Sequence, residues 1–223
     1  MVAETRKPYR GLGMEGMLAK WYARNTAKSM DDYRRAAEKV AQRLEPASRV
    51  LEVAPGPGYL AIALARLGPY VVAGLDISAT FVRLAADNAR EARVDVDFRK
   101  GDAAAMPFAD GVFDAIVCRA AFKNFSAPVK ALDEMHRVLR VGGFAIIIDL
   151  DKNASPTLIA DAVRDMRLGP INGWITRMTF KHLLLKRAYR PADMRAMAGQ
   201  SRFDTCELEL EGIGFEALLR KRA

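Results

Sequence analysis

Short apolar runs alternate with amphipathic stretches through the middle of the chain. The apolar runs, together with one stretch of alternating apolar and polar residues at 94–100, predict strands at 49–54, 70–76, 94–100, 112–120 and 143–150. Residues with helical spacing between them predict helices at 58–68, 78–92 and 128–140. Ser78 is a candidate N-cap of the second helix, and Val141-Gly142-Gly143 is expected to end the third. Five strands joined in this way are typical of a parallel, doubly wound α/β sheet.

The two flanks of this core have different patterns. Residues 1–48 predict a helical N-terminal cap that includes an amphipathic helix starting at Ser29. Residues 152–200 follow the fifth strand and read as mostly helical, which predicts a lid. Residues 201–223 contain two strand-like runs that meet at Gly212-Ile213-Gly214, a hairpin signal. We therefore expect a single domain over 1–223 whose core is 49–151.

Composition agrees with one globular domain. The chain has 223 residues, 51% of them hydrophobic, and no apolar run approaches the roughly 20 residues of a membrane span. The start has no apolar signal region, so a cytoplasmic protein without a membrane partner is expected. Cys118 and Cys206 both lie on predicted strands and are expected to be buried free thiols. With two cysteines and two histidines, no metal site is expected. The oligomeric state cannot be read from the sequence.

The net charge of +8 is concentrated in the flanks. Residues 1–50 and 152–223 each carry +5, whereas residues 51–151 carry −2. A basic surface attracts anionic partners, which include nucleic acid and anionic small molecules, and it also aids solubility. The charge alone does not distinguish among these roles.

The turn "APGPG" between the first strand and first helix is a candidate ligand site. Its glycines leave the backbone bare, and Gly56 to Ala61 formally fits the dinucleotide pattern G-x-G-x-x-G/A. Pro55 and Pro57 remove two of the N–H donors that would cradle a pyrophosphate, and Glu52 would repel it. A carboxylate beside a bare turn suits a cofactor with a sulfonium or ammonium group, such as S-adenosyl-L-methionine.

Two further acids follow the next strands. Asp76 ends the second strand and could accept hydrogen bonds from ribose hydroxyls, although a solvated aspartate at a strand end would look the same. Asp102 follows the third strand, where its oxygen could receive an adenine amino group or simply form a turn. The order of these acids after the glycine turn favours a nucleoside-bearing cofactor.

Several ordered motifs carry a family resemblance. "VLEVAPGPGYLAIALA", "GLDIS", "GDAAAMPFADGVFDAIVC" and "EMHRVLRVGGFAIIIDL" together resemble the class I S-adenosylmethionine-dependent methyltransferases. "AFKNFSAPVKALDEMHRVLRVGG" is similar to the ubiquinone/menaquinone C-methyltransferase branch, whose members act on small molecules. The resemblance covers about residues 47–151. It implies a Rossmann-like sheet of seven strands whose last strand is antiparallel, in agreement with the hairpin signal.

The resemblance also implies roles for individual residues. The methionine part of the cofactor would lie among Glu52, Ala54, Gly56, Gly58, Cys118 and Arg119. Asp76 would bind the ribose, Ile77 would cover the adenine face, and Asp102 and Ala103 would meet the adenine edge. Because a leading segment often folds over the cofactor in this fold, Tyr22 is a further candidate contact. One departure is that Ala54 stands where the family pattern E/D-x-G-x-G-x-G has its first glycine, which would narrow the site.

Residues for the acceptor and for catalysis are less marked. Methyl transfer from a sulfonium depends on alignment and a dry pocket more than on a strong base. Asp149, at the end of the fifth strand, and His182, in the lid, are candidate catalytic residues. Asn124 could orient an acceptor oxygen or cap a turn. The candidate walls of the acceptor pocket are aromatic residues that could equally be core: Phe122, Trp174, Phe180 and Tyr189.

The interpretation favoured by these residues is methyl transfer to a small-molecule acceptor, neutral or anionic. The alternative is a nucleic-acid (RNA) methyltransferase that uses the basic flanks, but "CRAAFKNF" lacks the Asn/Asp-Pro-Pro-aromatic motif of base N-methylating families. A nicotinamide enzyme and a non-catalytic partner protein are two further alternatives. The sequence does not identify the acceptor or the atom that is methylated.

Overall fold

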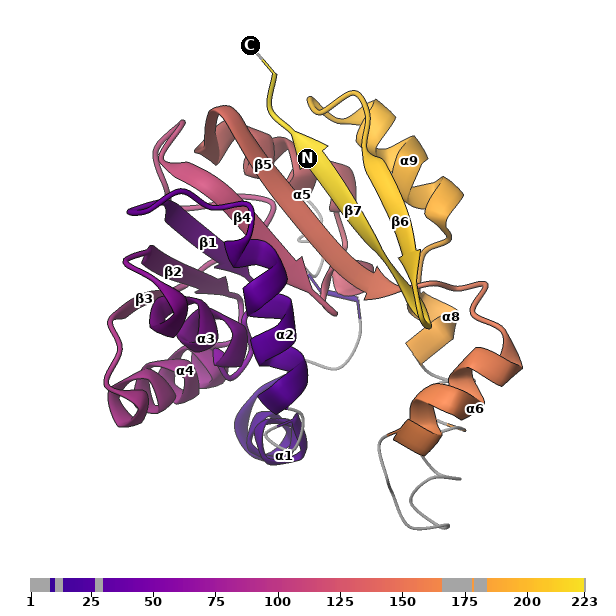
Figure 1. Cartoon of the computed structure of the whole chain (residues 1–223), viewed down its shortest axis with the longest axis horizontal. Coiled ribbons are helices and arrows are strands. Elements are labelled where there is room, and N and C mark those ends of the chain that lie inside the picture. Colours follow the sequence, from indigo (N-terminus) through magenta and orange to yellow (C-terminus); the bar gives the residue numbers. More distant parts are fainter. Residues whose placement is uncertain (1–8, 11–13, 27–29, 166–177, 179–183, 223) are drawn as a thin grey trace, which may run out of the picture.

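A seven-stranded sheet forms the centre of the protein (Figure 1). The structure is a computed structural model that describes residues 9–10, 14–26, 30–165, 178 and 184–222. The strands, in chain order, are β1 (Arg49–Val53), β2 (Val71–Asp76), β3 (Val96–Lys100), β4 (Phe113–Arg119), β5 (Leu139–Leu150), β6 (Glu207–Glu211) and β7 (Gly214–Arg220).

The strand order is β3-β2-β1-β4-β5-β7-β6. Pairs from β3 to β5 are parallel, whereas β7 runs antiparallel to both β5 and β6. The predicted fold class, a mostly parallel Rossmann-like sheet that ends in an antiparallel hairpin, is confirmed. The hairpin folds back so that its second strand lies beside β5. Strand order reverses between β1 and β4, and ligands of open α/β sheets bind at such a point, beyond the carboxyl ends of the strands.

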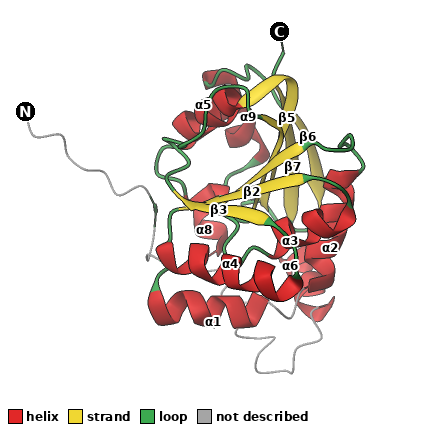
Figure 2. Ribbon diagram, turned by 90° about the vertical axis from the view of Figure 1, so that its left-hand side faces the viewer, coloured by secondary structure: helices red, strands yellow, loops and turns green. Residues whose placement is uncertain are grey.

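Helices cover both faces of the sheet (Figure 2). On one face, Ala36 and Ala37 of α2 and Leu60 and Leu64 of α3 share a core with β1, β2 and β4. On the other, Met135 of α5 and Met194 of α9 join the larger core. The bounds of these helices, with α4 beside β3, are α2 (Met30–Ala41), α3 (Tyr59–Leu67), α4 (Ala79–Ala92), α5 (Pro128–Val138) and α9 (Pro191–Gln200).

Shorter elements gather at the edge where the parallel strands end. They are α1 (Gly16–Thr26), the 3-10 turn η2 (Phe122–Asn124), α6 (Pro156–Asp165) and α8 (Leu185–Arg187). Figure 1 shows α1, α6 and α8 at the lower edge, below the arrowheads of β4 and β5. In the described part of the chain, no helix is both long and apolar enough to cross a membrane.

Three details differ from the predictions or fall outside the structure. The third predicted helix ends at Val138, and β5 already begins at Leu139, because Gly142 and Gly143 pair with Lys221 through backbone hydrogen bonds and so extend the strand. Cys206 lies one residue before β6 and is only half-buried, whereas Cys118 is buried on β4 as expected. The predicted N-cap Ser29 lies outside the described residues.

Candidate active site at the carboxyl edge of the sheet

The loop after β1 turns sharply through a left-handed backbone. Three of its residues have left-handed backbone angles, with φ of 58° at Ala54, 54° at Gly56 and 80° at Gly58. A Cβ added at Gly56 would meet nothing nearer than the Tyr22 ring, at 3.9 Å. A side chain at Gly58 would instead lie 2.7 Å from Phe98 and 2.9 Å from Cβ of Ala85. Gly56 therefore lies against the Tyr22 ring without crowding, whereas Gly58 allows α3, α4 and β3 to pack closely.

Asp76 ties this loop to the end of β2. Its Oδ2 accepts a hydrogen bond from the Gly56 amide at 3.0 Å, and its Oδ1 accepts one from the Ser78 amide at 2.8 Å. Burial raises the pKa of Asp76 to about 6, and these two backbone hydrogen bonds oppose the rise. Because each carboxylate oxygen has a second acceptor site, the side chain can still receive two hydroxyl groups of a ligand.

Glu52 is a second buried carboxylate beneath the same loop. Only 3% of the residue is exposed, and its Oε2 accepts a hydrogen bond from the Ala61 amide in the first turn of α3 at 2.8 Å. Burial raises the pKa of Glu52 to about 8, and the nearby Arg119 guanidinium moderates the rise. Burial disfavours the ionised form of both acids, and a cationic ligand beside them would favour it.

Tyr33 of α2 and Tyr59 of α3 lie near Arg119, which interacts electrostatically with Glu52. The Arg119 guanidinium lies 4.7 Å from the centre of the Tyr33 ring, and Tyr33 meets Tyr59 edge to face at 5.5 Å. Tyr59 in turn donates a hydrogen bond to the Ala23 carbonyl of α1 at 3.1 Å. Burial raises the pKa of Tyr33 to about 12. These tyrosine rings are therefore uncharged, and the positive charge near Glu52 comes from Arg119.

Glu15 anchors α1 on the start of α4, next to Asp76. Its carboxylate accepts hydrogen bonds from the Ala79 amide at 2.9 Å and the Thr80 amide at 3.1 Å, and also from the Thr80 hydroxyl. The predicted N-cap Ser78 accepts the Phe81 amide at 3.1 Å, which confirms that prediction. The first-turn amides of α4 are thus satisfied by two side chains.

A buried ion pair joins the ends of β4 and β5. The Lys123 ammonium lies 2.7 Å from Oδ1 of Asp149, and their side chains are 5% and 2% exposed. Asp149 also accepts hydrogen bonds from the backbone amides of Lys123 and Leu150, at 2.9 and 2.8 Å. The Lys123 ammonium donates a further hydrogen bond to the Ala120 carbonyl. In this arrangement Asp149 holds the η2 turn in place, and its role in catalysis stays a prediction.

A cavity of about 520 Å³ opens beside this ion pair. Its walls come from Lys123, the segment after β5, α8 and α9, and Tyr189 forms part of them. The Tyr189 ring lies 6.0 Å from Phe122, which itself is fully buried, and the Tyr189 hydroxyl accepts a hydrogen bond from Arg10 at 3.2 Å. Of the predicted pocket walls, Tyr189 therefore borders the cavity and Phe122 lies behind it. Trp174, Phe180 and the candidate catalytic His182 lie outside the described residues.

The remaining predicted residues lie around these features. Asp102 follows β3 and accepts the Ala104 amide at 2.9 Å, so it forms a turn that also includes the half-buried Ala103. This turn adjoins Asp76, whose carbonyl accepts the Gly101 amide. Ile77 is half-buried next to Asp76, and Cys118 is fully buried within β4. The Asn124 carbonyl accepts the amide of Arg10.

Several site residues were not identified from the sequence. Tyr33 could have been found, because it shares a helical stripe with Ala36, Ala37 and Val40. Tyr9 could not, since its segment has no periodicity. It pairs with Phe125 through a backbone bridge, and burial raises its pKa, which also responds to the charges of Asp76 and Asp149. Tyr9 therefore lies beside the end of the η2 turn.

Comparison with known proteins agrees with this geometry. Residues 51–147 match the family described as "Methyltransferase domain". A demethylmenaquinone methyltransferase of Deinococcus radiodurans is 33% identical over 153 residues, which is 68% of this chain and 57% of that protein. The chain spans little more than half the length of the curated relatives it matches.

Solved structures show the same fold. A putative S-adenosyl-L-methionine-dependent methyltransferase from Methanococcus maripaludis superposes with a TM-score of 0.76 at 21% identity, with 96% of each chain covered. Magnesium protoporphyrin IX methyltransferase from Synechocystis, solved with bound SAH, has a TM-score of 0.58 at 18% identity and covers 86% of this chain and 82% of its own.

Proposed function

We propose that the chain is a class I S-adenosylmethionine-dependent methyltransferase and that it transfers a methyl group from S-adenosyl-L-methionine to a small-molecule acceptor. The observation that carries the proposal is the pair of buried carboxylates, Glu52 and Asp76, that hydrogen-bond to backbone amides of the glycine loop and of the helix after it. The acceptor would lie beyond β4 and β5, in the cavity beside Lys123.

The chemistry of these residues fits the cofactor. Asp76 has acceptor sites left for the two ribose hydroxyls. A positive group near Glu52 would offset the cost of its ionisation, and the Arg119 guanidinium would suit the carboxylate of the methionine part. The bare backbone at Gly56 would let this part approach the loop.

When bound, the cofactor would supply a methyl group on a positively charged sulfur. The residues of this chain would position the cofactor and keep water from it, because α1, anchored by Glu15, and the Tyr22 ring lie beside the glycine loop. The Lys123–Asp149 pair fixes the η2 turn against β5, so that the wall of the acceptor cavity keeps its shape. The curated relatives are named for a quinone substrate, and a planar ring is the feature that we carry over to the acceptor of this chain.

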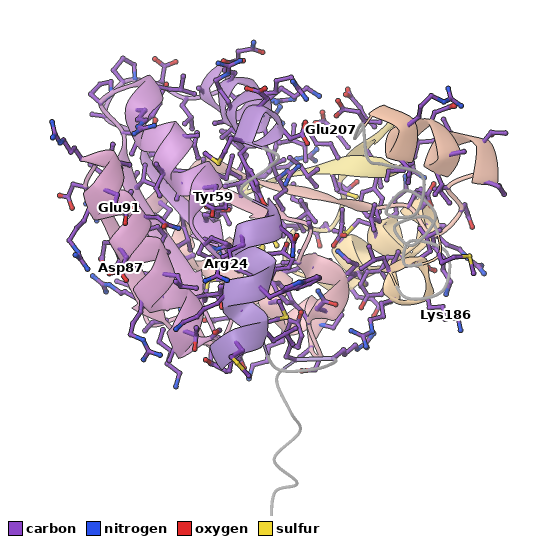
Figure 3. The ribbon with its side chains drawn as sticks, turned by 90° about the horizontal axis from the view of Figure 1, so that it is seen from below. Arg24, Tyr59, Asp87, Glu91, Lys186 and Glu207 are labelled. Atoms are coloured by element: carbon purple, nitrogen blue, oxygen red, sulfur yellow. The ribbon has the colours of Figure 1, made fainter. Side chains whose placement is uncertain are left out.

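Binding of S-adenosylhomocysteine, measured by calorimetry, tests the proposal. Asp76→Ala should weaken binding about 10- to 100-fold, since two hydrogen bonds to a charged group are lost. Asp87→Ala is the matched control, because Asp87 lies on the outer side of α4 and is exposed (Figure 3). Equal affinity of folded Asp76→Ala and Asp87→Ala would refute the ribose assignment.

A further inference from the structure

The cavity beside the Lys123–Asp149 ion pair is lined by more cationic than anionic residues. Five of its lining side chains are cationic and only one is a carboxylate; they are Arg10, Lys123, Lys152, Lys186, Arg187 and Asp193. These residues come from separate parts of the chain: the N-terminal segment, η2, the segment after β5, α8 and α9. The fold therefore brings together charges that are not neighbours in sequence.

The described residues leave much of this charge unneutralised. Lys123 is paired with Asp149, and the Asp193 carboxylate accepts the Arg190 amide as a cap of α9. Among the described residues, Lys152, Lys186 and Arg187 form no ion pair. Cations that converge on a concave site lower the free energy of a bound anion.

The cavity also has an apolar side. Ala188, Tyr189, Ala196 and Met197 line it, and Tyr189 is held in place by Arg10 and Phe122. A volume of about 520 Å³ is in the range of small-molecule sites, which combine apolar walls with a few convergent polar groups. Tyr189 would offer its ring to a flat ligand, and Lys186 and Arg187, which line the same cavity, would offer positive charge to an anionic substituent.

We propose that this cavity binds the carboxylate or phosphate group of the methyl acceptor, and that the acceptor is therefore a planar organic anion. The inference rests on the proposed function, because it treats the cavity as the acceptor site. Its connection to that site is Lys123, which lines the cavity while its ammonium pairs with Asp149 at the carboxyl end of β5. Arg187 suits a carboxylate or phosphate in particular, because a guanidinium can donate two parallel hydrogen bonds.

Calorimetry with simple probes tests the charge. Benzoate, phenyl phosphate and the neutral analogue benzamide are titrated into the full chain in 0.15 M NaCl, with and without S-adenosylhomocysteine. We expect benzoate or phenyl phosphate to bind at least tenfold more tightly than benzamide, and the tighter of the two identifies the anionic group. Equal affinity of all three probes would overturn the proposal. Inorganic phosphate that binds as tightly as phenyl phosphate would also overturn it, because the ring would then contribute nothing.

Variants locate the site. The double variant Lys186→Gln/Arg187→Gln should weaken the anionic probe about tenfold or more and leave S-adenosylhomocysteine binding within twofold. Arg195→Gln, on α9 and outside the cavity, is the control for loss of a surface cation and should change neither affinity. If the double variant binds the anion as the wild type does, the proposal fails. Failure of S-adenosylhomocysteine to bind the wild type would instead refute the proposed function, while the anion titration without it still decides the charge of the cavity.

Discussion

Replacing Glu52 by glutamine should stabilise the ligand-free protein above neutral pH. Glu52 is 3% exposed, and burial raises its pKa from 4.5 to about 8. At about 1.4 kcal/mol per pH unit, ionising this group in the folded state costs a few kcal/mol at pH 8.5. Glutamine keeps a carbonyl oxygen for the Ala61 amide and carries no charge. Its own buried amide adds a cost of about 1–3 kcal/mol, which does not vary with pH.

The dependence on pH is therefore the quantity to measure. Because the folded pKa of Glu52 is raised, its contribution to the free energy of unfolding is complete below about pH 4.5 and is lost as the pH rises toward 8. Asp76, with a pKa raised to about 6, adds a similar loss at lower pH. Between pH 6 and 8 the wild type should lose about 1.4 kcal/mol per pH unit through Glu52, and Glu52→Gln should not.

Urea denaturation followed by circular dichroism, from pH 5.5 to 8.5, measures this difference. Glu209→Gln is the matched control, because Glu209 is exposed on β6 and its replacement should leave the slope of the wild type unchanged. Affinity for S-adenosyl-L-methionine should rise with pH in the wild type, as Glu52 ionises, and not in Glu52→Gln. A Glu52→Gln protein whose stability declines with pH as steeply as that of the wild type would refute the reasoning.

Three other predictions concern the loop, the anchor of α1 and the ion pair. Ala54→Gly should stabilise the protein by about 0.5–1 kcal/mol in urea denaturation, because Ala54 has a φ of 58°. Glu15→Gln should increase amide hydrogen exchange at Ala79, because the Glu15 carboxylate accepts the hydrogen bond of this amide. Since the pKa of Glu15 is lowered in the folded protein, the stabilisation that Glu15 provides is present above about pH 4.5 and is lost in more acidic solution. Lys123→Met should destabilise the protein by about 3–5 kcal/mol, because it leaves the buried charge of Asp149 unpaired. The double variant Lys123→Met/Asp149→Asn leaves no such charge and should destabilise the protein by much less. Equal denaturation midpoints for the two variants would contradict this.

Local sequence patterns predicted the strands and helices, and they also identified Glu52 and Asp76 at the glycine loop. The apolar run that ends at Asp76 is a strand because its side chains are buried on both faces, and Ser78 begins the next helix by accepting the Phe81 amide. Both features depend on residues only a few positions apart, so they can be read from one stretch of sequence. The end of the third helix was misread because Gly142 and Gly143 pair with Lys221, which is far along the chain.

The parts of the site that depend on distant contacts could not be predicted. Asp149 was identified from its place at a strand end, but nothing near it in sequence indicates that Lys123, 26 residues earlier, neutralises it in the folded protein. The same holds for Arg10 and Lys186, which line one cavity only because Tyr189 and α8 lie beside the N-terminal segment. The sequence could locate an excess of basic residues in each flank. Only the fold shows that part of that excess converges on one cavity beside the ends of β4 and β5, where it can select the charge of a ligand instead of only raising solubility.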